Sequence, residues 1–199
     1  MKPSVPLVLV HGLWDDPHLF RRLTACLDGR RGDPCAPHLP HRFGATGLEV
    51  LAERLGGIIE ARFGSDQPLD LLGFSMGGVI GRLWIQSFGG QGRIRRFLSV
   101  GSPHRGTLLA QPCPRMPLAG IADMKIGSAL LRRLNADLSA LEGVECLSYW
   151  CLADAMVIPS WRGVLPVGSA IRLPVWQHKD LIAHPAALGP ISRELLRPD

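Results

Sequence analysis

An α/β fold with a mostly parallel sheet is the fold class that this sequence of 199 residues predicts. Short apolar segments alternate along the chain with segments whose apolar residues recur at helical spacing, which is the pattern of strands followed by helices. The first apolar segment, residues 5–10, is continuous and contains β-branched residues, as in a strand covered on both faces. A chain of this length fits one domain. We therefore expect a single domain over residues 1–199, with about six strands and helices on both faces of the sheet.

Local signals place each element in chain order. Asp15 or Asp16 followed by Pro17 should begin a helix that ends near Gly29. The run from Thr46 to Glu49 has the pattern of a capping box, and the helix after it should end at Gly64. Strands are expected at 5–10, 69–74, 94–100, 144–152 and 170–175, with a short extended piece around 33–39. Further helices are expected at 76–88, 128–141 and 184–196. A segment rich in Pro and Gly at about 107–127 could form a short cap loop.

Composition and charge exclude several classes of protein. The net charge of +5 comes from scattered basic pairs, not from a dense stripe with interleaved aromatic residues, so no nucleic-acid binding is expected. No apolar run reaches the roughly 18 residues of a transmembrane helix, so no integral membrane segment is expected. Without a recognisable signal peptide the expected location is cytoplasmic. The five cysteines include no C-x-x-C pair and no zinc spacing. A disulfide between Cys26 and Cys35 is left open.

The segment from Gly73 to Gly77 matches the G-x-S-x-G nucleophile elbow. In such an elbow the serine sits in a tight turn between a strand and a helix, and side chains two residues before or after it would clash. An apolar strand is expected before Ser75 and an amphipathic helix after it, which is the context that the motif requires. The backbone N–H of Met76, at the start of that helix, can then face a developing oxyanion.

Five segments spread over residues 7–190 resemble the α/β-hydrolase superfamily, and more closely its small bacterial lipase and esterase branch with a minimal lid or none. They are LVHGLW at 9–14, GFSMGG at 73–78, GSPHRGT at 101–107, ADAMVIP at 153–159, and His178 with the apolar residues that follow it. The resemblance implies a minimal α/β-hydrolase fold, Ser75 as nucleophile, and oxyanion donors at the backbone N–H groups of Leu13 and Met76. It also implies an acid after the penultimate strand and a histidine after the last one. Phe74 and Gln177 depart from the residues common in relatives.

Chain order and strand position select the acid. Triads on this kind of fold run Ser, then Asp or Glu, then His, and the carboxylate must lie at the carboxyl end of a strand. Asp154 directly follows the expected strand at 144–152 and meets this condition. The other candidates do not. Asp123 and Asp137 have no strand before them, Asp70 lies at the wrong end of its strand, and Asp180 is too close to the histidine candidates.

The histidine is a choice between His178 and His184. His178 follows the expected last strand after a short step, and Leu181 and Ile182 could pack its loop down. His184 lies directly before Pro185, where a helix should begin, so we favour His178. His11 is interpreted as structural, turning the first loop so that the N–H of Leu13 points inward. His104 is expected to line or brace the site, and His38 and His41 to lie on the surface.

The expected function is hydrolysis of a small-molecule or lipid carboxylic ester through an acyl-enzyme on Ser75, without a metal or an organic cofactor. Trp14, Phe74 and Leu108 are expected wall residues, and an apolar wall favours an acyl chain. Because only residues 107–127 could form a lid, short to medium acyl esters are expected. The alternatives are an acyltransferase or thioesterase with the same triad, or a non-catalytic binding protein, against which the complete Ser, Asp and His set argues. The sequence does not indicate the oligomeric state.

Overall fold

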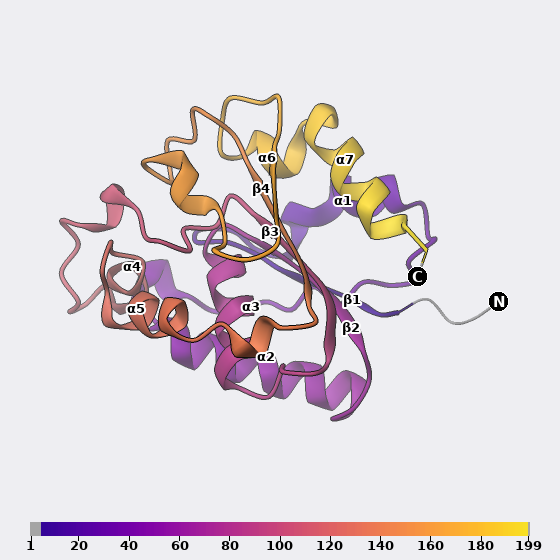
Figure 1. Ribbon diagram of the computed structural model, residues 1–199, viewed down its shortest axis with the longest axis horizontal. Coiled ribbons are helices and arrows are strands. Elements are labelled where there is room, and N and C mark those ends of the chain that lie inside the picture. The colour runs from indigo at the N-terminus through magenta and orange to yellow at the C-terminus, as the bar shows by residue number, and fades with distance from the viewer. Residues whose placement is uncertain (1–4, 199) are drawn as a thin grey trace.

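Five parallel strands form the centre of the computed structural model, which describes residues 5–198 (Figure 1). The strands lie in chain order across the sheet: β1 (Leu7–Val10), β2 (Leu69–Phe74), β3 (Ile94–Val100), β4 (Glu145–Trp150) and β5 (Ser169–Arg172). All four neighbouring pairs are parallel, so the carboxyl ends of the strands share one edge. The predicted α/β architecture and its mostly parallel sheet are confirmed.

Helices cover both faces of this sheet. They are α1 (Arg21–Leu27), α2 (Leu48–Phe63), α3 (Met76–Ser87), α4 (Ala119–Asp123), α5 (Ala129–Ala136), α6 (Asp180–Ala183) and α7 (Pro185–Leu196). In Figure 1, α2, α3 and α5 lie below the sheet and α1, α6 and α7 above it. Alternate strand residues feed two separate cores, because successive side chains of a strand point to opposite faces. Val8 and Val10 belong to the lower core, and Leu7 and Leu9 to the upper one.

The extended piece around 33–39 does not become a sixth strand. Only Cys35 pairs with β1, donating its N–H to Leu7 O and accepting from Leu9 N, both at 2.8 Å. The next donor in a parallel ladder would come from residue 37, which is proline and has no N–H. The ladder therefore stops after one residue. Cys35 is a buried free thiol and Cys26 an exposed one, so the disulfide left open by the sequence is not formed.

The capping box expected at the start of α2 is also replaced. Gly47 is the N-cap residue and has no side chain to offer, while Thr46 donates its hydroxyl to Pro40 O instead. The carboxylate of Asp123, at the end of α4, accepts from Leu48 N at 3.0 Å. Arg115 pairs with the other oxygen of the same carboxylate at 2.7 Å. The beginning of α2 is thus tied to the segment at 107–127.

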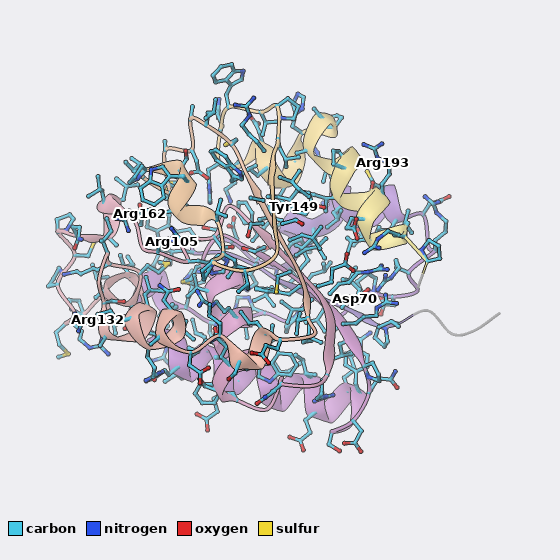
Figure 2. The ribbon with its side chains drawn as sticks, viewed as in Figure 1. Asp70, Arg105, Arg132, Tyr149, Arg162 and Arg193 are labelled. Carbon is cyan, nitrogen blue, oxygen red and sulfur yellow. The ribbon has the colours of Figure 1, made fainter. Side chains whose placement is uncertain are left out.

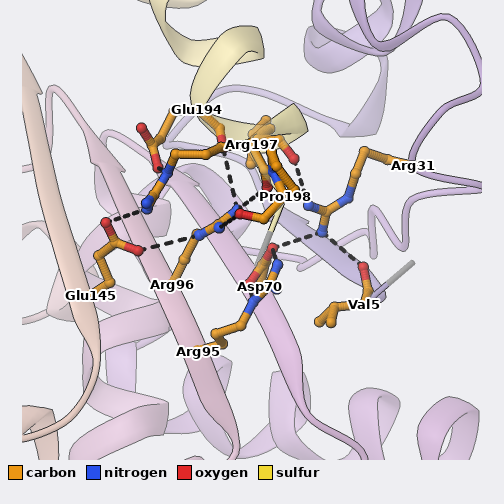
Figure 3. Close-up of polar contacts among 10 residues, drawn as sticks. Val5, Arg31, Asp70, Arg95, Arg96, Glu145, Glu194, Arg197 and Pro198 are labelled. Carbon is orange, nitrogen blue, oxygen red and sulfur yellow. Dashed lines mark hydrogen bonds and ion pairs between the residues drawn. The ribbon is translucent and has the colours of Figure 1, made fainter. Parts of the chain in front are cut away.

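Ion pairs fasten the edge of the sheet where the strands begin (Figure 3). Asp70, fully buried near the start of β2, pairs with Arg31 at 2.8 Å and with Arg95 at 2.7 Å. Arg31 also donates to Leu195 O, and Arg96 donates to Arg197 O, so the chain end after α7 is held against the sheet. Asp70 therefore serves the fold at the edge opposite the carboxyl ends. No helix in the described part of the chain is both long and apolar enough to cross a membrane.

Candidate active site

Ser75 occupies the turn between β2 and α3, with φ of 54° and ψ of −128°. A positive φ is uncommon outside glycine, and such strain persists only where the surroundings enforce it. The N–H of Ser75 donates to Val100 O of the neighbouring strand at 2.8 Å, which fixes the turn from one side. Ser75 is itself the N-cap of α3, so the amino end of that helix begins at the serine and leaves the N–H of Met76 at its first position.

The glycines around Ser75 are required because backbone passes on both sides of the turn. A Cβ at Gly73 would lie 2.4 Å from the Cα of Gly78, which is the close approach that the motif predicts. A Cβ at Gly77 would lie 2.1 Å from Val10 O, so the clash on this side is with the end of β1. These contacts place the end of β1, which leads into Leu13, directly against the turn.

His178 and Asp154 meet at the carboxyl edge of the sheet. Asp154 follows β4, and its Oδ2 lies 2.7 Å from His178 Nδ1. Its Oδ1 accepts from Met156 N at 2.8 Å and from Val157 N at 2.9 Å, so the carboxylate is held from both sides. Both side chains are at least nine-tenths buried. A carboxylate on Nδ1 leaves Nε2 as the ring nitrogen able to accept a proton.

His178 Nε2 is buried and has no hydrogen-bond partner among residues 5–198. The ring packs on Phe74, with ring centroids 4.8 Å apart, and a Cβ at Gly101 would lie 3.1 Å from its Cε1. Ser75 and His178 line the same pocket. His184, the alternative histidine, instead caps α7 by accepting from Ala186 N at 3.1 Å.

The first loop, which carries Leu13, is organised by His11. The ring is buried, places Nδ1 3.0 Å from Gly12 O, and accepts from Leu39 N at Nε2. Because Nε2 accepts, Nδ1 must carry the proton. Burial lowers the pKa of His11, which keeps it neutral in this role. A Cβ at Gly12 would lie 2.9 Å from Ser75 Cβ, so this loop passes directly beside the serine.

A pocket of about 710 Å³ opens beside Ser75. Its walls are mainly apolar and come largely from residues 107–127, including Leu109, Ala110, Cys113, Leu118, Ile121 and Met124. Trp14, a predicted wall residue, lines this pocket together with Leu13. A concave apolar site with a few convergent polar groups is the form that small-molecule sites commonly take.

Two of the predicted wall residues lie elsewhere. Phe74 is fully buried in the upper core beneath His178, because residues 74 and 75 point to opposite sides of the turn's backbone. Leu108 is 51% exposed and lies outside the pocket lining, whereas its neighbour Leu109 lines it. The short 3-10 helix at Leu108–Ala110 accounts for this, because it turns adjacent residues in different directions.

Three polar residues at the site are not among the site residues predicted from the sequence. Asp15 and Lys179 line the pocket and form an ion pair that joins the Leu13 loop to the His178 loop. Thr107 accepts from Ile158 N at 3.0 Å and donates to Met156 O at 2.9 Å, tying the 107–127 segment to the loop after Asp154. The motif at 101–107 marks Thr107, but nothing local marks a pairing between Asp15 and Lys179.

The remaining histidines lie outside the pocket lining. His104 is fully buried, with Nε2 2.6 Å from Ser99 Oγ and its ring in an edge contact with Phe97. It therefore anchors the loop at 101–107 to β3. His38 is exposed as predicted and stacks on His11, whereas His41 is half-buried. Within residues 5–198, no group of three or more His, Cys, Asp or Glu residues is placed to hold a metal ion.

Comparisons with known proteins agree with this geometry. The family model described as palmitoyl protein thioesterase matches residues 47–150, just over half of the chain. No curated protein matches the sequence. The mature form of Bacillus licheniformis lipase BlEst2 is similar in structure, with a TM-score of 0.76, 13% identity and coverage of 100% of this chain and 94% of the lipase. This chain spans only 52% of the propeptide form of that lipase.

Two further solved structures share the fold. Aspergillus fumigatus lipase B has a TM-score of 0.76 and 15% identity, with coverage of 98% of this chain and 53% of the lipase. The Paleococcus ferrophilus monoacylglycerol lipase has a TM-score of 0.70 and 14% identity, covering 97% of this chain and 96% of the lipase. The predicted α/β-hydrolase fold is confirmed, and the molecule is a minimal version of it with five strands.

Proposed function

Since this chain belongs to the palmitoyl protein thioesterase family, a hydrolase family of the lipase, esterase and thioesterase type, we propose that it hydrolyses acyl esters through an acyl-enzyme on Ser75. One observation carries the proposal. Ser75 and His178 line one apolar pocket, and Asp154 lies 2.7 Å from the far nitrogen of that histidine. A nucleophile, a base and an orienting acid in this relation are the parts of a serine hydrolase.

In the proposed mechanism Ser75 Oγ attacks the acyl carbonyl carbon while His178 Nε2 takes the hydroxyl proton. Asp154 accepts from Nδ1–H, which holds the tautomer and stabilises the charged imidazole. The N–H groups of Leu13 and Met76 donate to the oxyanion, each contributing about 3–4 kcal/mol. The leaving alcohol or thiol takes the proton from His178. Water then attacks the acyl-enzyme with the same histidine as base, which frees the acid and restores Ser75.

The pocket supports an acyl chain as the group that is transferred. Its walls are mainly apolar, and apart from Ser75 and His178 its polar side chains are Asp15, Thr107 and Lys179. Residues 107–127 contain only a three-residue 3-10 helix and the five-residue α4, so no long amphipathic lid covers the mouth. We propose short to medium acyl chains on this ground. A thioester substrate is the second candidate, favoured by the family whose model the chain matches.

The test compares p-nitrophenyl esters with thioesters of N-acetylcysteamine across a series of acyl lengths. Ser75→Ala should lower kcat/KM by at least about a thousandfold, as loss of a triad serine does. Ser65→Ala is the matched control and should retain activity, because Ser65 is exposed after the end of α2 and lies outside the pocket lining. Labelling of wild type, but not of Ser75→Ala, by a fluorophosphonate would locate the nucleophile independently of substrate choice. Absence of turnover and of labelling in the folded wild type would refute the proposal.

A further inference from the structure

Exposed apolar side chains gather at the edge of the sheet where the pocket opens. Among residues 5–198, seven large apolar side chains are more than half exposed. One of them, Val50, lies on α2. The other six follow the carboxyl ends of β1, β3, β4 and β5, and we call them the apolar rim: Trp14, Phe43, Leu108, Met116, Leu152 and Trp176. Since all strands are parallel, these loops lie at one edge of the molecule, at the left and top of Figure 1.

Cationic side chains accompany the apolar rim. Arg42 precedes Phe43, Arg115 precedes Met116, and Lys179 follows Trp176 by three residues. Figure 2 shows Arg105 beside Arg162 on the same side of the molecule, where Arg162 donates to Arg105 O at 2.6 Å. Exposed apolar side chains bordered by polar groups commonly mark a binding surface.

Three carboxylates of these loops are withdrawn from the surface, whereas Asp16, two residues after Trp14, is exposed. Asp15 pairs with Lys179 and its side chain is 8% exposed, and Asp123 pairs with Arg115 and is 5% exposed. Asp154 is buried against His178. Arg42 and Arg105 form no ion pair within residues 5–198 and are both exposed. The rim therefore presents apolar groups and positive charge to the solvent together.

We propose that the apolar rim and its cations dock this protein on the surface of an anionic lipid bilayer, with the pocket mouth facing the membrane. Aromatic and aliphatic side chains interleaved with Arg and Lys bind at such interfaces, because the first enter the headgroup boundary while the second attract anionic lipid. The side chains of the rim come from four separate loops, and a lipid bilayer can adapt its shape to such an uneven surface. An acyl substrate dissolved in the bilayer would then reach the pocket directly from the membrane surface.

A second copy of the chain fits the rim less well. A two-fold interface places the same patch on both sides, so Arg42 and Arg105 of both copies would be brought into one interface. Like charges in apposition disfavour such a contact. An acidic protein partner would meet the cations but would not account for the exposed aromatic groups at the pocket mouth. Dimerisation would indicate the second copy, and failure to bind vesicles would leave the acidic partner.

The experiment measures binding to vesicles with full-length Ser75→Ala protein, so that hydrolysis plays no part and failure of the proposed function would not affect the result. Co-sedimentation is compared for vesicles of phosphatidylcholine alone and of phosphatidylcholine mixed with phosphatidylglycerol. We expect strong binding to the mixed vesicles only. Brominated lipid in the same vesicles should quench tryptophan fluorescence, since Trp14 and Trp176 belong to the rim.

Variants in the Ser75→Ala background separate rim contacts from general charge. Adding Met116→Ser with Trp176→Ser should lower the vesicle partition coefficient at least about tenfold, because two largely exposed apolar groups are lost. Arg105→Gln should lower it about fivefold. Arg193→Gln is the matched control, because Arg193 is also exposed but lies on α7, at the right of Figure 2 and away from Arg105 and Arg162. This variant should bind like its parent.

Three results would overturn the proposal. The first is failure of the parent protein to sediment with either kind of vesicle. The second is unchanged binding when both Met116 and Trp176 are replaced. The third is concentration-dependent dimerisation that those replacements abolish, which would assign the rim to a second copy. With the natural Ser75 restored, the rim variants should hydrolyse a soluble acetyl ester at the parent rate, because Met116, Trp176 and Arg105 lie outside the pocket lining.

Discussion

The backbone of Ser75 is strained, and contacts with backbone atoms of neighbouring residues maintain this strained conformation. Its φ is 54°, and relaxing the turn would break the hydrogen bond from its N–H to Val100 O. Strain of this kind costs on the order of 1–3 kcal/mol and persists only where surrounding contacts enforce it. At the residue scale, the site therefore depends on close backbone contacts at positions where any residue larger than glycine would clash.

Replacing Gly77 by alanine should disturb both stability and reactivity. The added Cβ would lie 2.1 Å from Val10 O, a backbone atom at the end of β1, where Val10 is held by its pairing with β2. We expect a loss of about 1–3 kcal/mol in the free energy of unfolding, with slower fluorophosphonate labelling of Ser75. Gly57→Ala is the control, because nothing lies within 4 Å of its added Cβ. That change in the interior of α2 should stabilise the protein by roughly 0.5–1 kcal/mol. Equal urea midpoints for the two variants would contradict this account.

At the scale of elements, α2 begins where a distant carboxylate caps it. Asp123→Ala would leave Leu48 N without its acceptor and release Arg115, so we expect a loss of about 1–2 kcal/mol in a urea titration. The pocket should widen because α4 lines it through Ile121, and activity on longer acyl chains should change more than activity on acetyl esters. Arg115→Ala, which removes only an exposed partner, should cost less than about 1 kcal/mol. A larger effect of Arg115→Ala than of Asp123→Ala would count against the cap.

Elements with local signals could be predicted from the sequence, and elements set by distant contacts could not. The turn at Ser75 and its strand and helix follow from one motif and its apolar flanks. The cap on Leu48 joins residues 75 positions apart, so the local pattern from Thr46 to Glu49 favoured the wrong partner.

The sequence does not explain why glycine stands at position 56, inside α2. In the structure its added Cβ would lie 2.9 Å from Trp84 Nε1, so it allows α2 to pack closely on α3.

At the scale of the whole molecule, the two edges of the sheet carry different chemistry. The edge where the strands begin holds the buried pairs of Asp70 with Arg31 and Arg95, which fasten the chain end. The opposite edge holds Ser75, His178 and the apolar rim. This separation lets the catalytic edge vary in its loops while ion pairs and the two cores hold the strands together. Burial of histidines near the catalytic edge also makes the stability of the folded protein depend on pH.

Two buried histidines should make the folded state less stable in mild acid. Desolvation by burial lowers the pKa of His104 well below 6.5, assisted by the charge of Arg82, and burial also lowers the pKa of His11. Below pH 6.5 the unfolded chain binds protons at these positions that the folded chain refuses. Their contribution is therefore present above pH 6.5 and lost as pH falls, by up to about 1.4 kcal/mol per pH unit for each histidine. Urea titrations between about pH 7.5 and 5 should show this slope, before most carboxylates titrate.

His104→Gln should flatten this slope even if stability itself falls, while His38→Gln, at an exposed histidine, should leave it unchanged. An equal slope in wild type and His104→Gln would show that His104 titrates normally in the folded protein.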